Sequence, residues 1–328
     1  MKCATKPPQL AILGQALIWN PFVKPRTQNL TQMHELSQFK DSRLPYDLYP
    51  CLMNAAGPAM TVVSRPWSEG APYRVSLQAD GEVALASPDH LLPWWTRRDN
   101  SINRRFNDKL YKLYPRFGEQ LKVLDMGCSG GGFVKTCFDD GCLAVGLEGS
   151  DFSKRLGRAE WRTIPEYLFT CDITKKFSLT LQTAQGSGPL LFDVVTSWEV
   201  MEHIAEGDLP IVAANVKRHL AAGGLWIMSV SPNEEVINGA RLHQTVREKA
   251  WWIEMFGRLE LTHLEPYVSY FNTQFIRGPK YNAPGSFHLV LSRDPRQSPA
   301  IPPEGRLRRW HDIWLGSIPQ RVVSGTYF

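Results

Sequence analysis

The sequence has few cysteines, and they lack the spacing typical of zinc or disulfide frameworks. Six cysteines occur among 328 residues, and no two of them form a Cys-x-x-Cys pair. A structural zinc site needs closely spaced pairs, and a small secreted scaffold needs a far higher cysteine content. We therefore expect reduced thiols inside a core, which favours a reducing compartment and a cytoplasmic protein.

Long apolar runs and an excess of one charge are also lacking. No stretch approaches the ~20 apolar residues that a membrane span requires. Residues 10–19 are largely apolar, but no small-residue cleavage site follows, so we expect a packed or frayed N-terminal segment rather than a signal peptide. The formal net charge is only +5, from 37 Lys and Arg against 32 Asp and Glu. This balance permits an anionic partner without requiring one.

Proline is scarce in the middle of the chain. Of 24 prolines, five lie in residues 116–278, against twelve in 1–115 and seven in 279–328. Because proline removes a backbone donor, the middle is expected to hold regular structure. We divide the chain into an N-terminal extension (1–99) that could cap an acceptor site, a central domain (100–293) and a Pro/Arg-rich tail (294–328). The residues Trp310, Ile313 and Trp314 indicate that part of the tail docks onto another surface.

Seven apolar runs predict the strands of one sheet. Five of them are short and separated by helix-length segments, as in parallel strands buried on both faces; they are 122–126, 144–148, 167–171, 193–197 and 225–230. The last two, 259–264 and 287–291, are separated by a long loop and predict an antiparallel hairpin at the sheet edge. The expected fold class is α/β, with a doubly wound, mostly parallel seven-stranded sheet.

The N-terminal extension shows weaker signals. Residues 73–77 and 82–85 alternate around Ala79-Asp80-Gly81 and predict a small β-hairpin, and residues 60–64 could form another short strand. Next to the central domain, Asn100 or Ser101 is expected to cap a helix. Its apolar stripe comprises Ile102, Phe106, Leu110, Leu113 and Tyr114.

The segment from Val123 to Val134 carries the clearest chemical implication. A buried strand ends in Asp125 and passes through a glycine-rich turn into a helix. Glycines at such a turn let the backbone approach a ligand closely. The next strand ends at Glu148, 23 residues after Asp125, a spacing suited to a carboxylate that accepts hydrogen bonds from a ribose diol.

This segment resembles the first motif of the class I methyltransferases that use S-adenosylmethionine (SAM), Asp-x-Gly-x-Gly-x-Gly. Asp125, Gly127 and Gly131 match, and Ser129 replaces the middle glycine. Later motifs follow in the family's order at residues 148, 171–173, 192–203 and 220–225, so the resemblance covers roughly residues 100–293. A dehydrogenase that binds a nicotinamide cofactor shares the turn, but the segment Trp-Glu-Val-Met-Glu-His and the antiparallel last strand fit methyltransferases better. The resemblance implies a SAM-dependent methyltransferase of EC class 2.1.1.

The resemblance also implies a role for each matched residue. The amino-acid moiety of SAM would be held by Asp125 and by the backbone of Gly127, Ser129 and Gly131, and the ribose hydroxyls by Glu148. The adenine would be contacted by Asp172, which accepts from its amino group, and by Ile173, which lines the ring. The methyl-transfer cleft would be bordered by Trp198 and Glu199.

Methyl transfer to a hydroxyl requires removal of a proton, and the candidates are His243, Glu202 and His203. We favour His243 as the base because it follows the fifth strand, at the sheet edge where α/β proteins bind ligands; a loop histidine without a catalytic role is the alternative.

Glu199, Glu202 and His203 lie at i, i+3 and i+4 and would share a helical face, and with His243 they would suit a divalent cation. Two metal-using groups, the ubiquinone-pathway O-methyltransferases and the small-RNA 3′-end 2′-O-methyltransferases, have a similar Glu-x-x-Glu-His arrangement. Many class I enzymes carry these letters without a metal, so metal use stays open.

Three hypotheses remain for the acceptor. A hydroxyl of a sugar, glycan or small polar metabolite suits a histidine base and the tryptophans Trp94, Trp95, Trp251 and Trp252, although core packing explains these residues as well. RNA methylated at a 2′-oxygen is the second, with a basic patch of Arg97, Arg98, Arg104 and Arg105. A module that binds SAM without turnover is the third. We favour O-methylation of the first class, expect no membrane partner, and leave the oligomeric state open.

Overall fold

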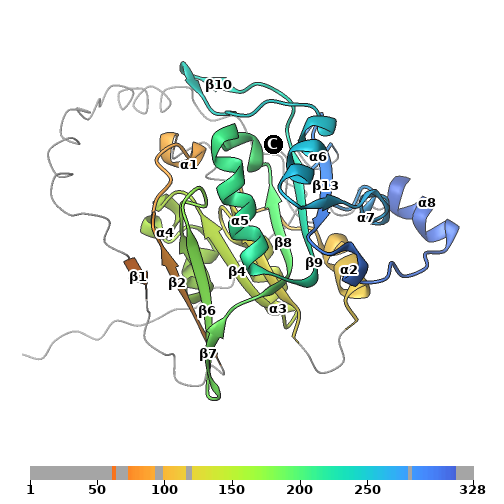
Figure 1. Ribbon diagram of the computed structural model, residues 1–328, viewed down its shortest axis with the longest axis horizontal. Coiled ribbons are helices and arrows are strands. Elements are labelled where there is room, and N and C mark those ends of the chain that lie inside the picture. The colour runs from red at the N-terminus through yellow and green to blue at the C-terminus, as the bar shows by residue number, and fades with distance from the viewer. Residues whose placement is uncertain (1–60, 64–72, 93–98, 116–119, 280–282, 315–328) are drawn as a thin grey trace, which may run out of the picture. The chain divides into compact units, whose positions relative to one another are not determined.

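The computed structural model describes residues 61–63, 73–92, 99–115, 120–279 and 283–314 (Figure 1). The predictions for residues 10–19, Trp94, Trp95, Arg97 and Arg98 lie outside these ranges. All described residues belong to one compact unit, Gly57–Phe328. No helix in the described ranges is long and apolar enough to cross a membrane.

A seven-stranded sheet forms the centre of this unit and confirms the predicted fold class. Its order is β12-β13-β9-β8-β3-β4-β5. Five strands run parallel: β3 (Lys122–Met126), β4 (Leu143–Glu148), β5 (Leu168–Thr170), β8 (Phe192–Trp198) and β9 (Leu220–Val230). The predicted antiparallel edge consists of β13 (Phe287–Ser292), which pairs with β9, and β12 (Thr262–His263), which pairs with β13. A helix, α7 (Glu265–Phe271), lies between these two strands where a loop alone was predicted.

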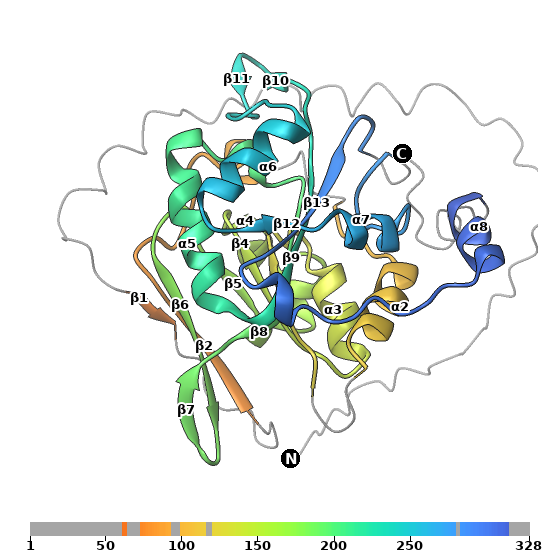
Figure 2. The same cartoon turned by 45° about the vertical axis from the view of Figure 1, so that its right-hand side comes forward.

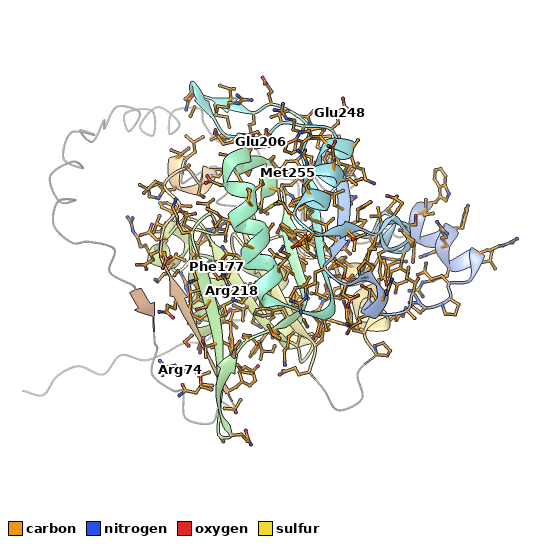
Figure 3. The ribbon with its side chains drawn as sticks, in the orientation of Figure 1. Arg74, Phe177, Glu206, Arg218, Glu248 and Met255 are labelled. Atoms are coloured by element: carbon orange, nitrogen blue, oxygen red, sulfur yellow. The ribbon has the colours of Figure 1, made fainter. Side chains whose placement is uncertain are left out.

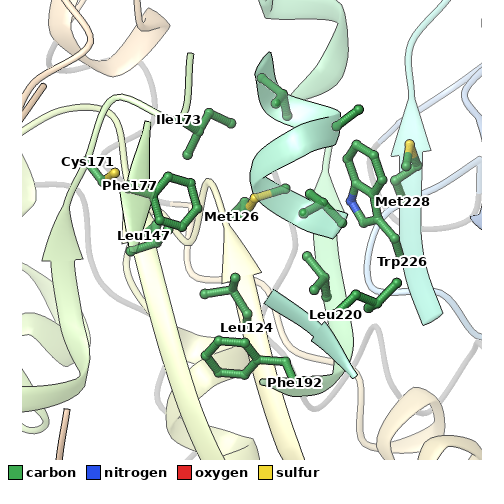
Figure 4. Close-up of a cluster of buried hydrophobic side chains, with 14 of the residues drawn as sticks. Leu124, Met126, Leu147, Cys171, Ile173, Phe177, Phe192, Leu220, Trp226 and Met228 are labelled. Carbon is green, nitrogen blue, oxygen red and sulfur yellow. The ribbon is translucent and has the colours of Figure 1, made fainter. Parts of the chain in front are cut away.

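Helices cover both faces of this sheet (Figures 1 and 2). Neighbouring strand residues point to opposite faces, so Leu124 and Met126 enter one core while Val123 enters the other. The first core packs against α5 (Leu209–His219) and α6 (Lys249–Arg258), and Figure 4 shows part of it. The second packs against α2 (Arg104–Leu113), α3 (Gly132–Asp139) and α7. Full burial of one such apolar side chain is worth roughly 1.5–3 kcal/mol.

A second, four-stranded sheet has the order β1-β2-β6-β7 and corrects the predicted hairpin. Residues 82–85 form no strand; instead β2 (Tyr73–Ala79) pairs antiparallel with β6 (Phe177–Thr183), about a hundred residues away. The alternating side chains of β2 and β6 enter the first core together, and this shared burial favours the distant partner. The short strand predicted at 60–64 is present as β1 (Thr61–Val63), and β7 (Gly186–Pro189) completes the sheet.

Polar contacts join the second sheet to α5. Arg218 of α5 donates a hydrogen bond to the backbone carbonyl of Phe177 in β6 at 3.1 Å (Figure 3). His219 accepts a hydrogen bond from the backbone N–H of Leu179 at 3.0 Å. The strand β2 is therefore part of the same folded unit as the central sheet, through β6 and α5.

The helix predicted after residue 100 is α2, but it begins later than expected. Its cap is Asn103 rather than Asn100 or Ser101, and the Asn103 side chain accepts from the backbone N–H of Arg105 at 3.0 Å. The Asn103 amide also donates to the carbonyls of Gln274 and Phe275. This second pair of bonds is a tertiary contact, so the helix start depends on a loop 170 residues away and not on local sequence alone.

The remaining elements are short. The helices are α1 (Pro88–Leu91), α4 (Phe152–Leu156) and α8 (Arg306–Trp314), and two small strands, β10 (Val236–Ile237) and β11 (Ala240–Arg241), pair with each other. Turns of 3₁₀ helix occur at Ala159–Arg162, Pro165–Tyr167, Met201–His203, Glu206–Asp208 and Pro295–Gln297.

Candidate active site

Two carboxylates lie together at the carboxyl edge of β3 and β4. The strands pair with Asp125 opposite Gly146, and the backbone N–H groups of Gly127 and Cys128 both donate to the Leu147 carbonyl, at 2.8 and 3.0 Å. These bonds fold the turn back over the end of β4. Glu148, at the end of β4, accepts a hydrogen bond from the backbone N–H of Ser129 at 2.7 Å. This bond holds the Glu148 carboxylate against the glycine-rich turn.

The two outer glycines of the turn are required by space as well as by conformation. Gly127 and Gly131 have φ angles of +76° and +86°, in the left-handed region that side chains disfavour. A Cβ on Gly127 would lie 2.4 Å from Val200, and one on Gly131 would lie 2.8 Å from Leu168. The turn therefore cannot keep this path with larger residues at these positions.

Ser129 also adopts a left-handed conformation, with φ of +48°. Its hydroxyl accepts from Arg158 at 2.9 Å and lies 3.1 Å from the Asp99 carbonyl, to which it donates. The indole N–H of Trp161 donates to the Ser129 carbonyl at 2.8 Å. These contacts offset the strain of a non-glycine residue here and use the side chain that a glycine would lack.

Asp125 is an unusual carboxyl group. Burial raises its pKa from 3.8 to about 7, against the effect of the Thr196 hydroxyl, which donates to Asp125 Oδ1 at 2.7 Å and lowers the pKa. The negative charges of Glu148 and Asp99 raise it further. Two buried carboxyls and the partly exposed Asp99 together provide a site for a cationic group.

A cavity of about 280 Å³ opens beside this edge. Its wall includes eight of the predicted site residues: Gly127, Ser129, Glu148, Asp172, Ile173, Trp198, Glu199 and His203. A smaller hollow of about 30 Å³ shares Gly127, Ser129 and Trp198 with the cavity and adds Asp125. Glu202, His243 and Gly131 line neither space.

The adenine-side candidates lie on the loop after β5. Asp172 donates its backbone N–H to the Gly81 carbonyl at 3.0 Å, and its Oδ1 accepts from both the backbone N–H and the hydroxyl of Thr174. Ile173 is 8% exposed, and Asn215 donates to its carbonyl at 3.0 Å. The loop is thus fixed by several bonds while both side chains reach the cavity wall.

Several residues at the cavity carried no sequence signal. Arg277, on the loop before β13, lines the smaller hollow and lies 3.4 Å from the Asp99 carboxylate and from the Ser101 hydroxyl. Among the described residues, its buried Nε has no hydrogen-bond partner. The segment 84–88, which follows β2, also lines the cavity, and the Ala84 N–H donates to the Gly149 carbonyl at 2.7 Å. This segment lies next to Glu148 and Asp172, and no motif connects such distant residues.

The predicted helical face at Glu199–His203 is wrong. Glu199 has φ of +55° and precedes a 3₁₀ turn, Met201–His203, because β8 ends at Trp198 and the chain turns sharply there. Glu199 Oε2 accepts from the Ser286 hydroxyl at 2.8 Å, while its buried Oε1 has no hydrogen-bond partner within the described ranges.

Glu202 is fully buried. Its Oε1 accepts from the Ser231 N–H at 3.0 Å, and its Oε2 has no hydrogen-bond partner in the part of the chain that the structure describes. Burial, with a contribution from the charge of Glu199, raises the pKa of Glu202 well above its usual range. The Glu202 side chain is therefore an incompletely satisfied acceptor in the core.

The two candidate histidines, His203 and His243, have different hydrogen-bond partners. His203 Nδ1 donates to the Leu242 carbonyl at 3.0 Å, which leaves Nε2 unprotonated, and burial lowers the pKa of His203 to about 4. His243 Nδ1 donates to the Asn233 carbonyl at 2.6 Å, and its Nε2 lies 3.2 Å from a carboxylate oxygen of Glu235.

Glu202, His203 and His243 lie close enough to hold one metal ion. One donor atom from each of the three lies within 4.8 Å of the others, and the two imidazole centroids are 4.7 Å apart. Glu199, the fourth predicted ligand, is not part of this group. A carboxylate oxygen without a partner beside two imidazoles is a donor set suited to a divalent cation.

Comparisons with known proteins agree with the motifs. A family model described as a methyltransferase domain matches residues 95–277, more than half of the chain. A ubiquinone biosynthesis O-methyltransferase from Bartonella quintana (strain Toulouse) is 24% identical over 113 residues, which is 34% of this chain and 42% of that enzyme. The match thus spans less than half of that relative's length.

Solved structures include relatives of low sequence identity. A SAM-dependent methyltransferase from Clostridium acetobutylicum aligns at 13% identity over 62% of this chain and 97% of its own, with a TM-score of 0.43. An amino pentose methyltransferase from Micromonospora echinaspora aligns at 15% identity over 61% of this chain and 94% of its own, with a TM-score of 0.41.

Proposed function

This chain belongs to the methyltransferase domain family, as its motifs predicted, and we propose that it transfers a methyl group from SAM to a hydroxyl oxygen of a sugar, glycan or small polar metabolite. The main support for the proposal is the arrangement at one edge of the sheet. There the glycine-rich turn (Gly127–Gly131) is hydrogen-bonded to Glu148 and follows Asp125, and a cavity of about 280 Å³ lies beside it. That volume is near the lower end of the ~300–1,000 Å³ range of small-molecule sites.

The residues fit the parts of SAM by charge. The buried carboxyl of Asp125 and the partly exposed carboxyl of Asp99 suit its ammonium group. The Nε of Arg277, which lacks a hydrogen-bond partner among the described residues, suits its carboxylate. Glu148 supplies carboxylate oxygens for the ribose hydroxyls. Asp172 and Ile173 then suit the adenine amino group and ring. SAM itself, when bound, supplies a methyl group on a positively charged sulfur.

We assign the proton-accepting role to His203 rather than to His243, which the sequence favoured. His203 lines the cavity with an unprotonated Nε2, whereas both ring nitrogens of His243 contact the protein. As the acceptor oxygen bonds to the methyl carbon, the carbon–sulfur bond breaks and its electrons stay on sulfur, and the hydroxyl proton passes to His203 Nε2. His243 packs against His203 and positions it.

A divalent cation is the alternative use of the same residues. Glu202, His203 and His243 would hold it, and the Glu202 oxygen that now has no partner would gain one. A bound cation supplies positive charge that makes a nearby hydroxyl easier to deprotonate. The O-methyltransferase named above is a relative over part of its length, which supports oxygen as the atom methylated. Titration with Mg²⁺ or Mn²⁺ and removal by EDTA distinguish the two arrangements.

The alternative acceptors have less support. Arg104 and Arg105 of the predicted RNA patch each pair with a carboxylate, Asp140 at 2.6 Å and Asp312 at 3.2 Å, so part of the positive charge of the patch is neutralised within the protein. Trp252 is fully buried in the core, as the packing explanation of the tryptophans predicted. RNA as the acceptor would give binding that weakens steeply as salt rises, and a sugar would not.

Calorimetry and a labelled-methyl assay test the proposal. Asp125→Ala and Glu148→Ala should each abolish or greatly weaken SAM binding. With labelled SAM and fractionated cell extract as the acceptor pool, His203→Asn should bind SAM normally and lower turnover by about 10²-fold or more, since asparagine keeps the bond to the Leu242 carbonyl. His311→Asn, at an exposed histidine far along the chain, is the control.

Three results would contradict the proposal or the base that it assigns. Absence of SAM binding by the unaltered protein would remove the cofactor site. SAM binding without product from any fraction would instead indicate a binding module. If His243→Asn, and not His203→Asn, lowers turnover, the base is His243 as the sequence predicted.

A further inference from the structure

The helix α8 is attached to the domain by charged groups. Asp312 is 3% exposed, and one of its carboxylate oxygens lies 3.2 Å from the Arg105 guanidinium, while the other lies 3.7 Å from the Lys109 ammonium. Lys109 is itself buried, and it also pairs with Glu304 at 2.6 Å. The Gln274 amide donates to the Asp312 carbonyl at 2.7 Å. The inner side of this helix is thus polar.

The outer side of α8 is apolar. Leu307 is 85% exposed, Trp310 is 55% exposed and Trp314 is 65% exposed. These positions are spaced i, i+3 and i+7, so at 100° per residue they form one stripe along the helix. In both views α8 lies at the outer edge of the domain, beyond α2 and α7 (Figures 1 and 2). This arrangement inverts the usual one, in which an amphipathic helix buries its apolar stripe.

Positive charge flanks the apolar stripe on one side. At 100° per residue, Arg306 lies about 70° from the centre of the stripe, whereas Arg308 and Arg309 lie about 130° from it, toward the side of Asp312. Arg306, Arg308 and Arg309 are all exposed, and the Nε of Arg308 lies 3.6 Å from a carboxylate oxygen of Asp312. Tryptophan favours the boundary between water and hydrocarbon, and arginine is attracted to anionic headgroups. Arginine next to tryptophan also occurs in nucleic-acid sites, but a leucine that is 85% exposed on the same stripe offers nothing to stack on a base.

We propose that α8 is an interfacial helix that lays Leu307, Trp310 and Trp314 onto an anionic membrane surface, with Arg306 beside the stripe on the headgroups. The charge of the helix complements such a surface, and the stripe supplies the apolar area that interfacial binding requires. The proposal concerns where the protein works and is independent of the reaction. The earlier expectation of no membrane partner rested on the lack of a spanning segment, which an interfacial helix does not need.

Cosedimentation of the full chain with vesicles tests this assignment. The protein should bind vesicles of phosphatidylcholine with about one-third phosphatidylglycerol and bind pure phosphatidylcholine at least tenfold more weakly. Trp310→Ser with Trp314→Ser should weaken binding at least tenfold. Arg306→Gln should weaken it roughly fivefold, which is the effect of one arginine near an anionic surface.

Matched controls separate α8 from general surface effects. Leu156→Ser with Leu191→Ser alters two leucines that are 52% and 40% exposed elsewhere, and Arg155→Gln with Arg258→Gln removes two exposed arginines elsewhere. Neither control should change vesicle binding by more than about twofold. All variants should keep the unaltered thermal midpoint, because none of the altered side chains is buried.

Other outcomes would overturn the assignment. Absence of binding to anionic vesicles, or equal binding by the Trp310/Trp314 variant, would refute it. Loss of self-association in that variant, without an effect on vesicles, would make the stripe a contact between copies. Salt-sensitive binding to a single-stranded RNA oligonucleotide that depends on α8, without vesicle binding, would make it a nucleic-acid surface.

Discussion

The raised pKa of Asp125 predicts a specific change in stability with pH. The carboxyl is buried at the end of β3 and titrates at about 7, against an ordinary value of 3.8. Between these values the folded protein keeps a proton that the unfolded chain has lost. The free energy of unfolding should therefore fall as pH rises, with a slope that approaches 1.4 kcal/mol per pH unit.

The variant Asp125→Asn has no ionisable group at this position but keeps the size and shape of the side chain. Its amide oxygen can still accept from the Thr196 hydroxyl, which lies 2.7 Å from Asp125 Oδ1. A shift from 3.8 to about 7 makes the unaltered protein lose about 2.5 kcal/mol relative to Asp125→Asn between about pH 4.5 and about pH 6.5. Other titrating groups are common to both proteins and cancel in the difference.

Urea unfolding of both proteins across this pH range, without cofactor, gives the required free energies. The variant should gain stability relative to the unaltered protein as pH rises. Thr196→Val supplies a further check. Without the hydroxyl that lowers the Asp125 pKa, that pKa should rise, and the free energy of unfolding should keep falling to a higher pH than in the unaltered protein. A difference that stays constant within about 0.5 kcal/mol, or that changes with the opposite sign, would refute the proposed burial of a protonated carboxyl.

Three further predictions concern the cofactor turn and the tail. Gly131→Ala should lower the free energy of unfolding in urea by about 2–4 kcal/mol, because the added Cβ would lie 2.8 Å from Leu168. Gly141 has a similar φ of +88°, but its added Cβ would meet no described atom within 4 Å, so Gly141→Ala should cost only about 1–2 kcal/mol. Equal costs for the two variants would contradict the argument that crowding by Leu168 matters. Lys109→Met should cost about 3 kcal/mol because it removes the buried cation beside α8, whereas Lys135→Met, at an exposed pair, should cost less than about 1 kcal/mol. SAM affinity measured by calorimetry should fall about tenfold per pH unit below about pH 7, since the ammonium of SAM needs an ionised Asp125, and a flat profile would remove that contact.

The central sheet could be predicted from the sequence because each parallel strand is buried on both faces. Such strands read as short apolar runs, and the runs at 122–126 and 144–148 match β3 and β4 to within a residue. The glycine turn was predictable for a related reason: its backbone path excludes most side chains at Gly127 and Gly131. These features are local, so local sequence determines them.

Features that depend on distant partners could not be predicted. The alternation of residues 73–77 indicated a strand but not its partner, since β6 lies about a hundred residues later. The choice between His203 and His243 depends on which backbone carbonyl holds each ring, and those carbonyls belong to Leu242 and Asn233. Arg277 reaches the smaller hollow from a loop that carries no motif.

The pairing of β2 with β6 has a practical consequence for anyone who wishes to produce the catalytic part alone. A truncation at residue 95, where the family match begins, would delete Val75, Leu77 and Ala79 from the main core and leave one side of β6 unpaired. An open strand edge of this kind is prone to aggregation. A shortened protein that stays folded and does not aggregate should therefore begin before Tyr73, so that β2 is retained, and preferably before Thr61, so that β1 is retained as well.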